Sequence, residues 1–292
     1  MTGRIVSKVR KLFDHPGFKA HPAAVLWRCA ALLVRVALGR PITFHLTADG
    51  ERLQVPANLR YTTLTAFVMR DHLEPELHHL PRLVRAGDVF IDIGANIGVY
   101  SLRAASLAGP QGRIVAVEPG ADALAALRRN MALNPERAVT VVAAALGDHT
   151  GTATLYHVGN GYDPQAFSLL SDETANGEES VPLTTLDAMC ADLALAQVDC
   201  VKMDAEGVEP LVLAGGRATL ERFHPAVILE MNIATLGRRS SPTHQAWDFL
   251  EGLGYGFHRI IDDAPVKLSA PPQDFCNVIA THPANDRLGG LL

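Results

Sequence analysis

Glycines and acidic residues stand where short apolar segments of this chain end. Segment 89–93 runs into the loop 92–98, DIGANIG, and segment 113–117 ends at Glu118. Glycines permit a tight strand-to-helix turn and a close approach of a ligand to the backbone. A dinucleotide fingerprint has a glycine where this loop has Asp92, and a carboxylate there repels a pyrophosphate but attracts an ammonium or sulfonium group. The loop therefore favours S-adenosylmethionine over a nicotinamide dinucleotide, and the chain has no P-loop motif.

The predicted cofactor site combines this loop with two later strand ends. Glu118, 26 residues after Asp92, is expected to accept hydrogen bonds from the ribose hydroxyls. Leu146 is expected to flank the adenine ring, and Asp148 to accept from its amine, although a plain turn explains this segment equally well. The predicted cofactor-binding residues are Asp92, Gly94, Asn96, Gly98, Glu118, Leu146, Asp148 and Asp204.

Alternating strands and helices must position these residues. The apolar pattern predicts a helix over 74–85 and strands at 89–93, 113–118, 139–145, 198–204, 226–230, 255–261 and 275–281. Such alternation is typical of a mostly parallel sheet, here of seven strands, with helices on both faces and the ligand at the carboxyl ends of the strands. The alternation breaks at about 150–186, where we expect an inserted hairpin over the mouth of the site.

Five motifs occur in a specific order over residues 75–235: FIDIGANIGVYSL, AVEP, ALGDHTGTATLY, VKMDAEGVEPLVLAGG and ILEMN. In this order they resemble the FkbM-type methyltransferases, a family of class I S-adenosylmethionine-dependent enzymes. The resemblance implies the Rossmann-like α/β fold of that class. It also implies methyl transfer to a hydroxyl of a sugar, glycoconjugate or secondary metabolite, with a small-molecule or glycan acceptor. The alternative is a catalytically silent cofactor-binding or assembly module of the same fold.

Methyl transfer to an alcohol needs a base that takes the hydroxyl proton as the new bond forms. Asp204, Glu206 and Glu209 follow the strand 198–204, at the expected rim of the cleft. They are the favoured candidates, although Asp204 could instead hold the cofactor ammonium, and Glu209 could cap the next helix. His157, in the inserted hairpin, is the other candidate for a catalytic residue. No ligand spacing demands a metal ion, and none is predicted.

The first 40 residues differ in charge from the rest of the chain. They hold eight Lys or Arg and one Asp, a net charge of +7, whereas the whole chain carries −5. A helix over 23–38 either lies on an anionic membrane surface or packs on protein, including a second copy of the chain. We expect residues 1–73 to be a basic extension of helices and short strands, and residues 74–285 to be the methyltransferase domain.

The overall composition excludes several classes of protein. With 48% hydrophobic and 20% charged residues the chain is not mainly disordered, and its negative net charge argues against a general nucleic-acid binder. Four cysteines without a CxxC pair indicate a reducing compartment. No uncharged apolar run approaches about 18 residues. These features predict a cytoplasmic protein, with peripheral membrane contact or self-association through residues 1–40 left open.

Overall fold

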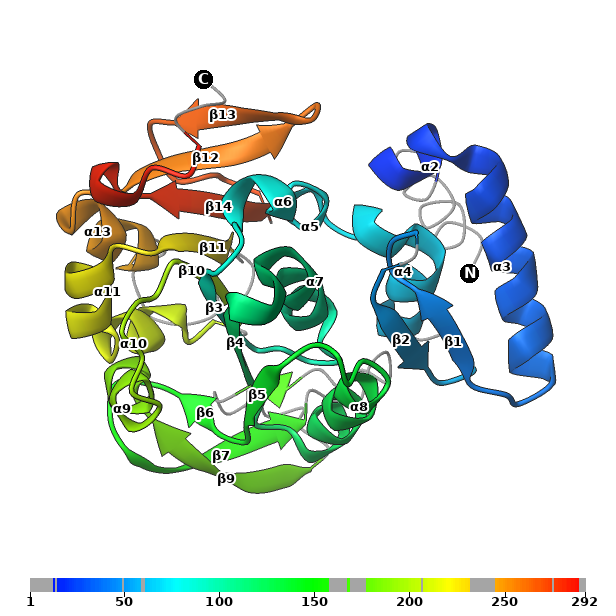
Figure 1. Cartoon of the computed structure of the whole chain (residues 1–292), viewed down its shortest axis with the longest axis horizontal. Coiled ribbons are helices and arrows are strands. Elements are labelled where there is room, and N and C mark those ends of the chain that lie inside the picture. The colour runs from blue at the N-terminus through cyan, green and yellow to red at the C-terminus, as the bar shows by residue number, and fades with distance from the viewer. Residues whose placement is uncertain are drawn as a thin grey trace. The chain divides into compact units, whose positions relative to one another are not determined.

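Two compact units, Met1–His78 and His79–Leu292, make up the chain (Figure 1). The computed structural model describes residues 13, 15–48, 50–58, 61–157, 167–168, 177–205, 207–231, 245–274 and 276–288, with the backbone alone at 61–64, 157 and 167–168. Within these ranges, no helix combines the length and the apolar character needed to cross a bilayer.

The first unit pairs a small hairpin with several helices. Its elements are α2 Pro16–Ala20, α3 Pro22–Ala37, β1 Ile42–His45, β2 Arg52–Val55, α4 Tyr61–Met69, the 3-10 helix η1 Arg70–His72 and α5 Pro75–His78. The strands β1 and β2 are antiparallel, with Ile42 opposite Val55. Proline at the first turn of α3 suits a helix start, and Val25 and Leu32, seven residues apart, form its buried side. The helix expected over 23–38 is therefore α3.

The second unit holds the large sheet and most of the helices. Its helices are α6 Leu80–Leu83, α7 Val99–Ala108, η2 Gly109–Gln111, α8 Ala121–Ala132, α9 Leu186–Asp192, α10 Glu209–Ala214, α11 Arg217–Phe223, α13 Gln245–Gly252 and η3 Pro283–Asn285. Its strands are β3 Val89–Ile93, β4 Arg113–Val117, β5 Val139–Val142, β6 Ala145–Leu146, β7 Gly151–His157, β8 Phe167–Ser168, β9 Glu178–Thr184, β10 Cys200–Met203, β11 Ala226–Met231, β12 Gly256–Ile261, β13 Ala264–Leu268 and β14 Cys276–Thr281.

The central sheet confirms the predicted mostly parallel α/β fold. Its order is β13-β12-β14-β11-β10-β3-β4-β5, and the strands from β11 to β5 run parallel to one another. Beyond them β14, β12 and β13 are joined by antiparallel pairing. The sheet has one strand more than the seven expected. The extra strand is β13, which follows β12 through Asp262 and Asp263, whose φ angles of 47° and 62° are those of a tight hairpin turn.

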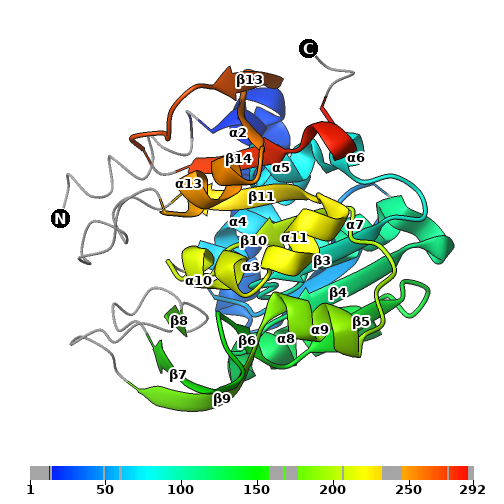
Figure 2. The same ribbon diagram turned by 90° about the vertical axis from the view of Figure 1, so that its left-hand side faces the viewer.

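Helices cover both faces of this sheet (Figures 1 and 2). On one face, Ile91 and Ile93 belong to a buried cluster with Leu186 of α9, Leu213 of α10 and Trp247 of α13. On the other face, Ala116 of β4 packs with Leu127 of α8, and α7 lies against β3 and β4. Because side chains alternate along a strand, Asp92 points to the face covered by α7, whereas its neighbours Ile91 and Ile93 point to the opposite face.

Two predicted elements are divided in the structure. The helix expected over 74–85 is two short helices, α5 and α6, because Pro81 in the first turn of α6 has no N–H to continue a helix from α5. The third expected strand is split into β5, in the central sheet, and β6. The latter joins a second sheet of order β6-β9-β7-β8, in which β7 and β9 pair antiparallel across the inserted segment.

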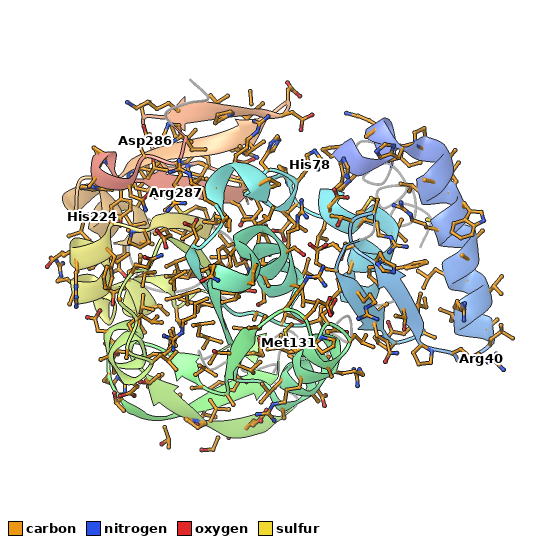
Figure 3. The ribbon with its side chains drawn as sticks, in the orientation of Figure 1. Arg40, His78, Met131, His224, Asp286 and Arg287 are labelled. Atoms are coloured by element: carbon orange, nitrogen blue, oxygen red, sulfur yellow. The ribbon has the colours of Figure 1, made fainter. Side chains whose placement is uncertain are left out.

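Arg287 closes the second unit at the start of two central strands (Figure 3). Its buried guanidinium forms ion pairs with Asp88, which precedes β3, and with Asp199, which precedes β10. Asp199 in turn accepts a hydrogen bond from the backbone N–H of Val89 at 2.8 Å. These contacts lie at the amino ends of β3 and β10. The carboxyl ends of the same strands therefore remain open for a ligand.

Candidate functional site

A cleft opens at the carboxyl ends of β3, β4 and β10. It encloses about 620 Å³, its open mouth included, which is in the range of small-molecule sites. Its polar lining comes from the glycine loop and two carboxylates, and its apolar lining from the segments that follow β5 and β10. The lining residues are Ile93, Gly94, Asn96, Val117, Glu118, Pro119, Ala144, Ala145, Leu146, Leu155, Asp204, Ala205 and Val208.

Gly94 is required by the way the loop packs. Its φ is +74°, and a Cβ added there would lie 1.9 Å from the carbonyl oxygen of Asp204. The backbone N–H groups of Gly94 and Ala95 both donate to the carbonyl of Val117 at 3.0 Å. The loop therefore lies flat against the ends of β4 and β10, and any side chain at Gly94 would push these elements apart.

Glu118 links the loop to the end of β4. One carboxylate oxygen accepts from the N–H of Asn96 at 2.8 Å, and the other from the N–H of Gly120 at 2.9 Å. Burial raises the pKa of Glu118 to about 7, although both backbone hydrogen bonds lower it. Each carboxylate oxygen has a second lone pair, so Glu118 can also accept from hydroxyls in the cleft that it lines.

Asp92 lies behind the loop and is not among the lining residues. Its side chain is buried against α7, where the hydroxyl of Ser101 donates to Oδ2 at 2.6 Å. Oδ1 has no hydrogen-bond partner among the described residues. Burial raises the pKa of this carboxyl, and the positive charge of Lys202 opposes that rise. The structure therefore places Asp92 against α7, and its predicted role in cofactor binding stays a prediction.

Asp204 lines the cleft at the end of β10 and has a cationic partner. Its Oδ2 lies 3.0 Å from Nζ of Lys202, whose side chain is 7% exposed, whereas that of Asp204 is 30% exposed. Nζ also lies 5.3 Å from the ring centre of Tyr100. Lys202 was not among the site residues predicted from the sequence. The signal that could have identified it is a lysine between the apolar residues of the predicted strand 198–204.

Glu209 is turned into its own loop. It is buried, and its Oε1 accepts from the backbone N–H groups of Ala205 at 3.0 Å and Gly207 at 3.1 Å. Burial raises its pKa. Glu209 is not among the residues that line the cleft. Glu209 thus holds the turn that precedes α10, whereas α10 itself has Val208 at its N-cap and no side-chain cap.

The segment after β5 provides the apolar part of the cleft. Leu146 lines it, together with the neighbouring Ala144 and Ala145. Asp148, predicted to bind the adenine amine, does not line it. Its carboxylate instead lies 2.7 Å from Nδ1 of His149, a hydrogen bond that lowers the pKa of Asp148.

The remaining predicted residues lie elsewhere or outside the described part. Gly98, with φ +87°, begins α7 and packs towards α8, where a Cβ would meet the side-chain ends of Leu127 and Met131. Glu206 and the side chain of His157 lie outside the described residues. Their predicted catalytic roles therefore stay predictions.

The cleft suits a nucleoside that carries a cationic tail. Glu118 offers acceptors for hydroxyls, the Ala144–Leu146 segment offers an apolar surface for a base, and Asp204 offers a carboxylate either to a cation or to an acceptor hydroxyl. Oδ1 of Asn96 is buried without a hydrogen-bond partner among the described residues and belongs to the lining. Among the residues that the structure describes, Asn96 therefore keeps an acceptor without a donor at the wall of the cleft.

The comparisons with known proteins agree with this geometry. A model of the FkbM methyltransferase domain matches residues 92–257. A curated 2-O-methyltransferase, NoeI of Sinorhizobium fredii, is 30% identical over 154 residues, which are 48% of this chain and 62% of that protein. The matched part thus spans less than two thirds of that relative.

Two solved structures show a weaker likeness. A methyltransferase FkbM from Methylobacillus flagellatus aligns with 89% of this chain and 60% of its own, at 16% identity and a TM-score of 0.42. An S-adenosylmethionine-dependent O-methyltransferase from Thermotoga maritima aligns with 71% of this chain and 64% of its own, at 12% identity and a TM-score of 0.37.

Proposed function

The chain belongs to the FkbM methyltransferase family, whose methyl donor is S-adenosylmethionine, and from this premise we propose that it methylates a hydroxyl of a sugar or glycoconjugate. The observation that carries the proposal is the pair of carboxylates, Glu118 and Asp204, that face one cleft beside the glycine loop. The oxygen-directed part rests on the relative NoeI, a 2-O-methyltransferase.

Each part of the cleft has a task in this reaction. When bound, S-adenosylmethionine would supply a methyl group on a positive sulfur; the acceptor oxygen would form the new bond to the methyl carbon, and the sulfur would keep the electron pair of the bond that breaks. Glu118 would hold the ribose end, and the loop at Gly94 would let the ligand approach the backbone closely. Because the displacement needs the oxygen in line with the bond that breaks, positioning of this kind supplies much of the acceleration.

Asp204 is our candidate for the residue that receives the acceptor proton. It ends a buried strand, its backbone N–H is held by the carbonyl of Ile93 at 3.1 Å, and its carboxylate lines the cleft. Lys202 fixes the direction of that carboxylate by binding Oδ2. A carboxylate held in this way has a lone pair ready for the acceptor hydroxyl and returns the proton to solvent after transfer.

Binding and turnover can be tested separately. Calorimetry with S-adenosylhomocysteine measures cofactor binding, and a panel of sugars, glycoconjugates and phenols is then screened for S-adenosylhomocysteine formation from S-adenosylmethionine. We expect binding to one site and methylation of a sugar hydroxyl, located by mass spectrometry of the product. Methylation at nitrogen or carbon would contradict the oxygen-directed proposal. Binding without turnover across the panel would favour the catalytically silent module.

We further propose that α3 places the enzyme at an anionic membrane surface. Its solvent-facing side carries an apolar stripe with helical spacing, whose large members are Leu26, Trp27, Leu33, Val34 and Leu38, all more than half exposed. Lys19, Arg35 and Arg40 are exposed around this stripe, and the sequence has no acidic residue between Asp14 and Asp49. An apolar stripe flanked only by cations is complementary to anionic lipid.

Vesicle sedimentation tests this surface. The full chain is mixed with anionic or neutral vesicles at low and high salt, beside Trp27→Ser and the control Val266→Ser, which alters an exposed valine in β13. We expect the wild type and the control to sediment with anionic vesicles at low salt, and Trp27→Ser to remain in solution. Equal behaviour of all three proteins would exclude the membrane role. A Trp27-dependent dimer on gel filtration would assign the stripe to self-association instead.

A further inference from the structure

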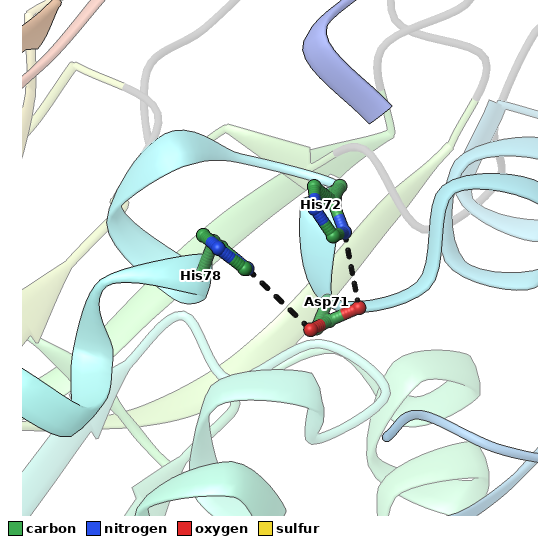
Figure 4. A group of neighbouring side chains, drawn as sticks. All are labelled: Asp71, His72 and His78. Carbon is green, nitrogen blue, oxygen red and sulfur yellow. Dashed lines mark hydrogen bonds and ion pairs between the residues drawn. The ribbon is translucent and has the colours of Figure 1, made fainter. Parts of the chain in front are cut away.

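A cluster of one carboxylate and two imidazoles lies in the first unit, outside the segment that matches the family model. Asp71 and His72 belong to η1, and His78 ends α5. One potential ligand atom from each lies within 4.8 Å of the other two, and all three residues are half-buried. Figure 4 shows both imidazoles beside the same carboxylate, one on each oxygen.

The spacing of these atoms is close to that of a metal site. Nδ1 of His72 lies 3.2 Å from Oδ1 of Asp71, and Nδ1 of His78 lies 3.5 Å from Oδ2. With bonds of about 2.0–2.1 Å, the ligand atoms of a tetrahedral zinc ion lie about 3.3 Å apart. The two rings are stacked, with centroids 4.2 Å apart and planes 29° from parallel. Small side-chain rotations therefore suffice to direct all three donors at one ion.

The 3-10 helix η1, which carries Asp71 and His72, is held in place by contacts of its first residue. Arg70, the first residue of η1, places its guanidinium 4.2 Å from the ring centre of Phe44 and donates to the carbonyl of His45. The N–H of Leu73 closes the turn on the carbonyl of Arg70 at 3.1 Å. Asp71 and His72 thus lie on a fixed segment, which reduces the entropy lost when a ligand binds.

The donor set determines the class of ion. Neutral imidazoles with one carboxylate suit zinc and similar transition metals, whereas magnesium and calcium prefer oxygen ligands alone. The positive charges of Arg28 and Arg70 act on Asp71, so an ion must bind strongly enough to share this carboxylate with them. We propose that Asp71, His72 and His78 bind one divalent ion of the zinc class, with the fourth position open to solvent.

Metal binding is measured on the full-length chain without an affinity tag. After treatment with a chelator, equilibrium dialysis against Zn²⁺ followed by elemental analysis gives the stoichiometry, and calorimetry gives the affinity. We expect one ion per chain. Substitution by Co²⁺ is expected to give the visible absorption of a tetrahedral nitrogen–oxygen site, without the charge-transfer band of a cysteine thiolate.

Two ligand variants and a matched histidine control identify the site. Asp71→Asn and His72→Asn each remove a ligand, so each is expected to weaken Zn²⁺ binding by about 100-fold or more. The control is His224→Asn, because His224 (Figure 3) is stacked on His282 at 4.0 Å in the second unit and is not part of the cluster. It is expected to bind Zn²⁺ like the wild type.

Three results would overturn the proposal: a wild-type chain that binds no Zn²⁺, variants that retain wild-type affinity, or a cobalt spectrum with thiolate bands. If a variant fails to fold, Zn²⁺ binding by the wild-type chain and its cobalt spectrum still test the proposal. Binding of S-adenosylhomocysteine, followed in parallel, reports on the second unit. The metal inference is therefore judged separately from the proposed methyltransferase function.

Discussion

Two turns at the carboxyl edge of the central sheet hold a buried glutamate in the same way, one after β4 and one after β10. Glu118 and Glu209 each accept two backbone N–H groups at 2.8–3.1 Å. Burial raises the pKa of both. Yet Glu118 lines the cleft and Glu209 does not.

The comparison shows that hydrogen bonds from the protein backbone to a buried carboxylate do not by themselves indicate that the carboxylate binds a ligand. Both glutamates stabilise their turns by satisfying N–H groups that the local backbone leaves unpaired. What separates them is access to the cleft, which Glu118 lines and Glu209 does not. In the turn after β10 that exposed role falls to Asp204, which precedes Glu209 by five residues and lines the cleft.

The largest effect is expected from Asp204→Asn, which keeps the shape of the side chain and removes the proton acceptor. Turnover should fall by about 10²- to 10⁴-fold, the usual contribution of a general base, while the affinity for S-adenosylhomocysteine changes by less than about threefold. Steady-state kinetics and calorimetry check this. A loss confined to cofactor affinity would mean that Asp204 holds the cofactor ammonium.

Glu118→Ala comes next. Loss of a hydrogen bond to a charged acceptor costs about 1.5–3 kcal/mol, so S-adenosylhomocysteine should bind about ten- to a hundredfold more weakly. Calorimetry measures the change, with circular dichroism to verify folding. Asp122→Ala, which removes a solvent-facing acid at the start of α8, is the matched control. Unchanged affinity in Glu118→Ala would remove Glu118 from the ribose site.

A pH titration should separate the two glutamates further. The ribose hydroxyls donate to the ionised form of Glu118, whose pKa is about 7 in the free protein. Cofactor affinity should therefore rise with pH through this value and be about tenfold higher at pH 8 than at pH 6. The slope should be absent in Glu118→Gln and unaltered in Glu209→Gln. A flat profile for the wild type would show that ionisation of Glu118 does not control binding.

The smallest effect on the cofactor is expected from Glu209→Ala. This change leaves two N–H groups of the turn without their acceptor, so the free energy of unfolding should fall by about 1–3 kcal/mol. Cofactor affinity of the folded fraction should stay within about twofold of the wild type. Urea unfolding and calorimetry give the two quantities. A large loss of affinity in a stably folded variant would make the two turns equivalent in function.

The sequence predicts those parts of the fold that follow from local patterns. The buried strands β3, β4, β10 and β11 can be recognised as apolar runs in the sequence. Gly94 directly follows β3 and Glu118 directly follows β4, as expected for residues that bind a nucleoside at the carboxyl ends of parallel strands. These residues line the cleft, as does Leu146. The position of each of these residues follows from the strand directly before it in the sequence, so a short stretch of sequence is enough to predict it.

The parts that could not be predicted depend on the direction in which each side chain points and on the partner that it meets in the folded chain. Lys202 meets Asp204 only because both point to the same side of the end of β10, and Asp92 meets Ser101 only after α7 has packed on the sheet. Asp148 was predicted to face the cleft, but its neighbour His149 offers a nearer partner. The cluster of Asp71, His72 and His78 was not predicted because two of its members are adjacent and the third is six residues further on, a spacing that matches no recognised metal motif.

The ion pairs of Arg287 also bear on the kinetics of the fold. Arg287 lies 199 residues after Asp88 and 88 residues after Asp199, so loop-closure entropy places these contacts late in folding. Interactions that are absent from the transition state stabilise the native state by slowing unfolding and leave the folding rate almost unchanged. We therefore expect the ion pairs of Arg287 to slow unfolding and to lengthen the lifetime of the native sheet, acting at the amino ends of its strands, away from the cleft.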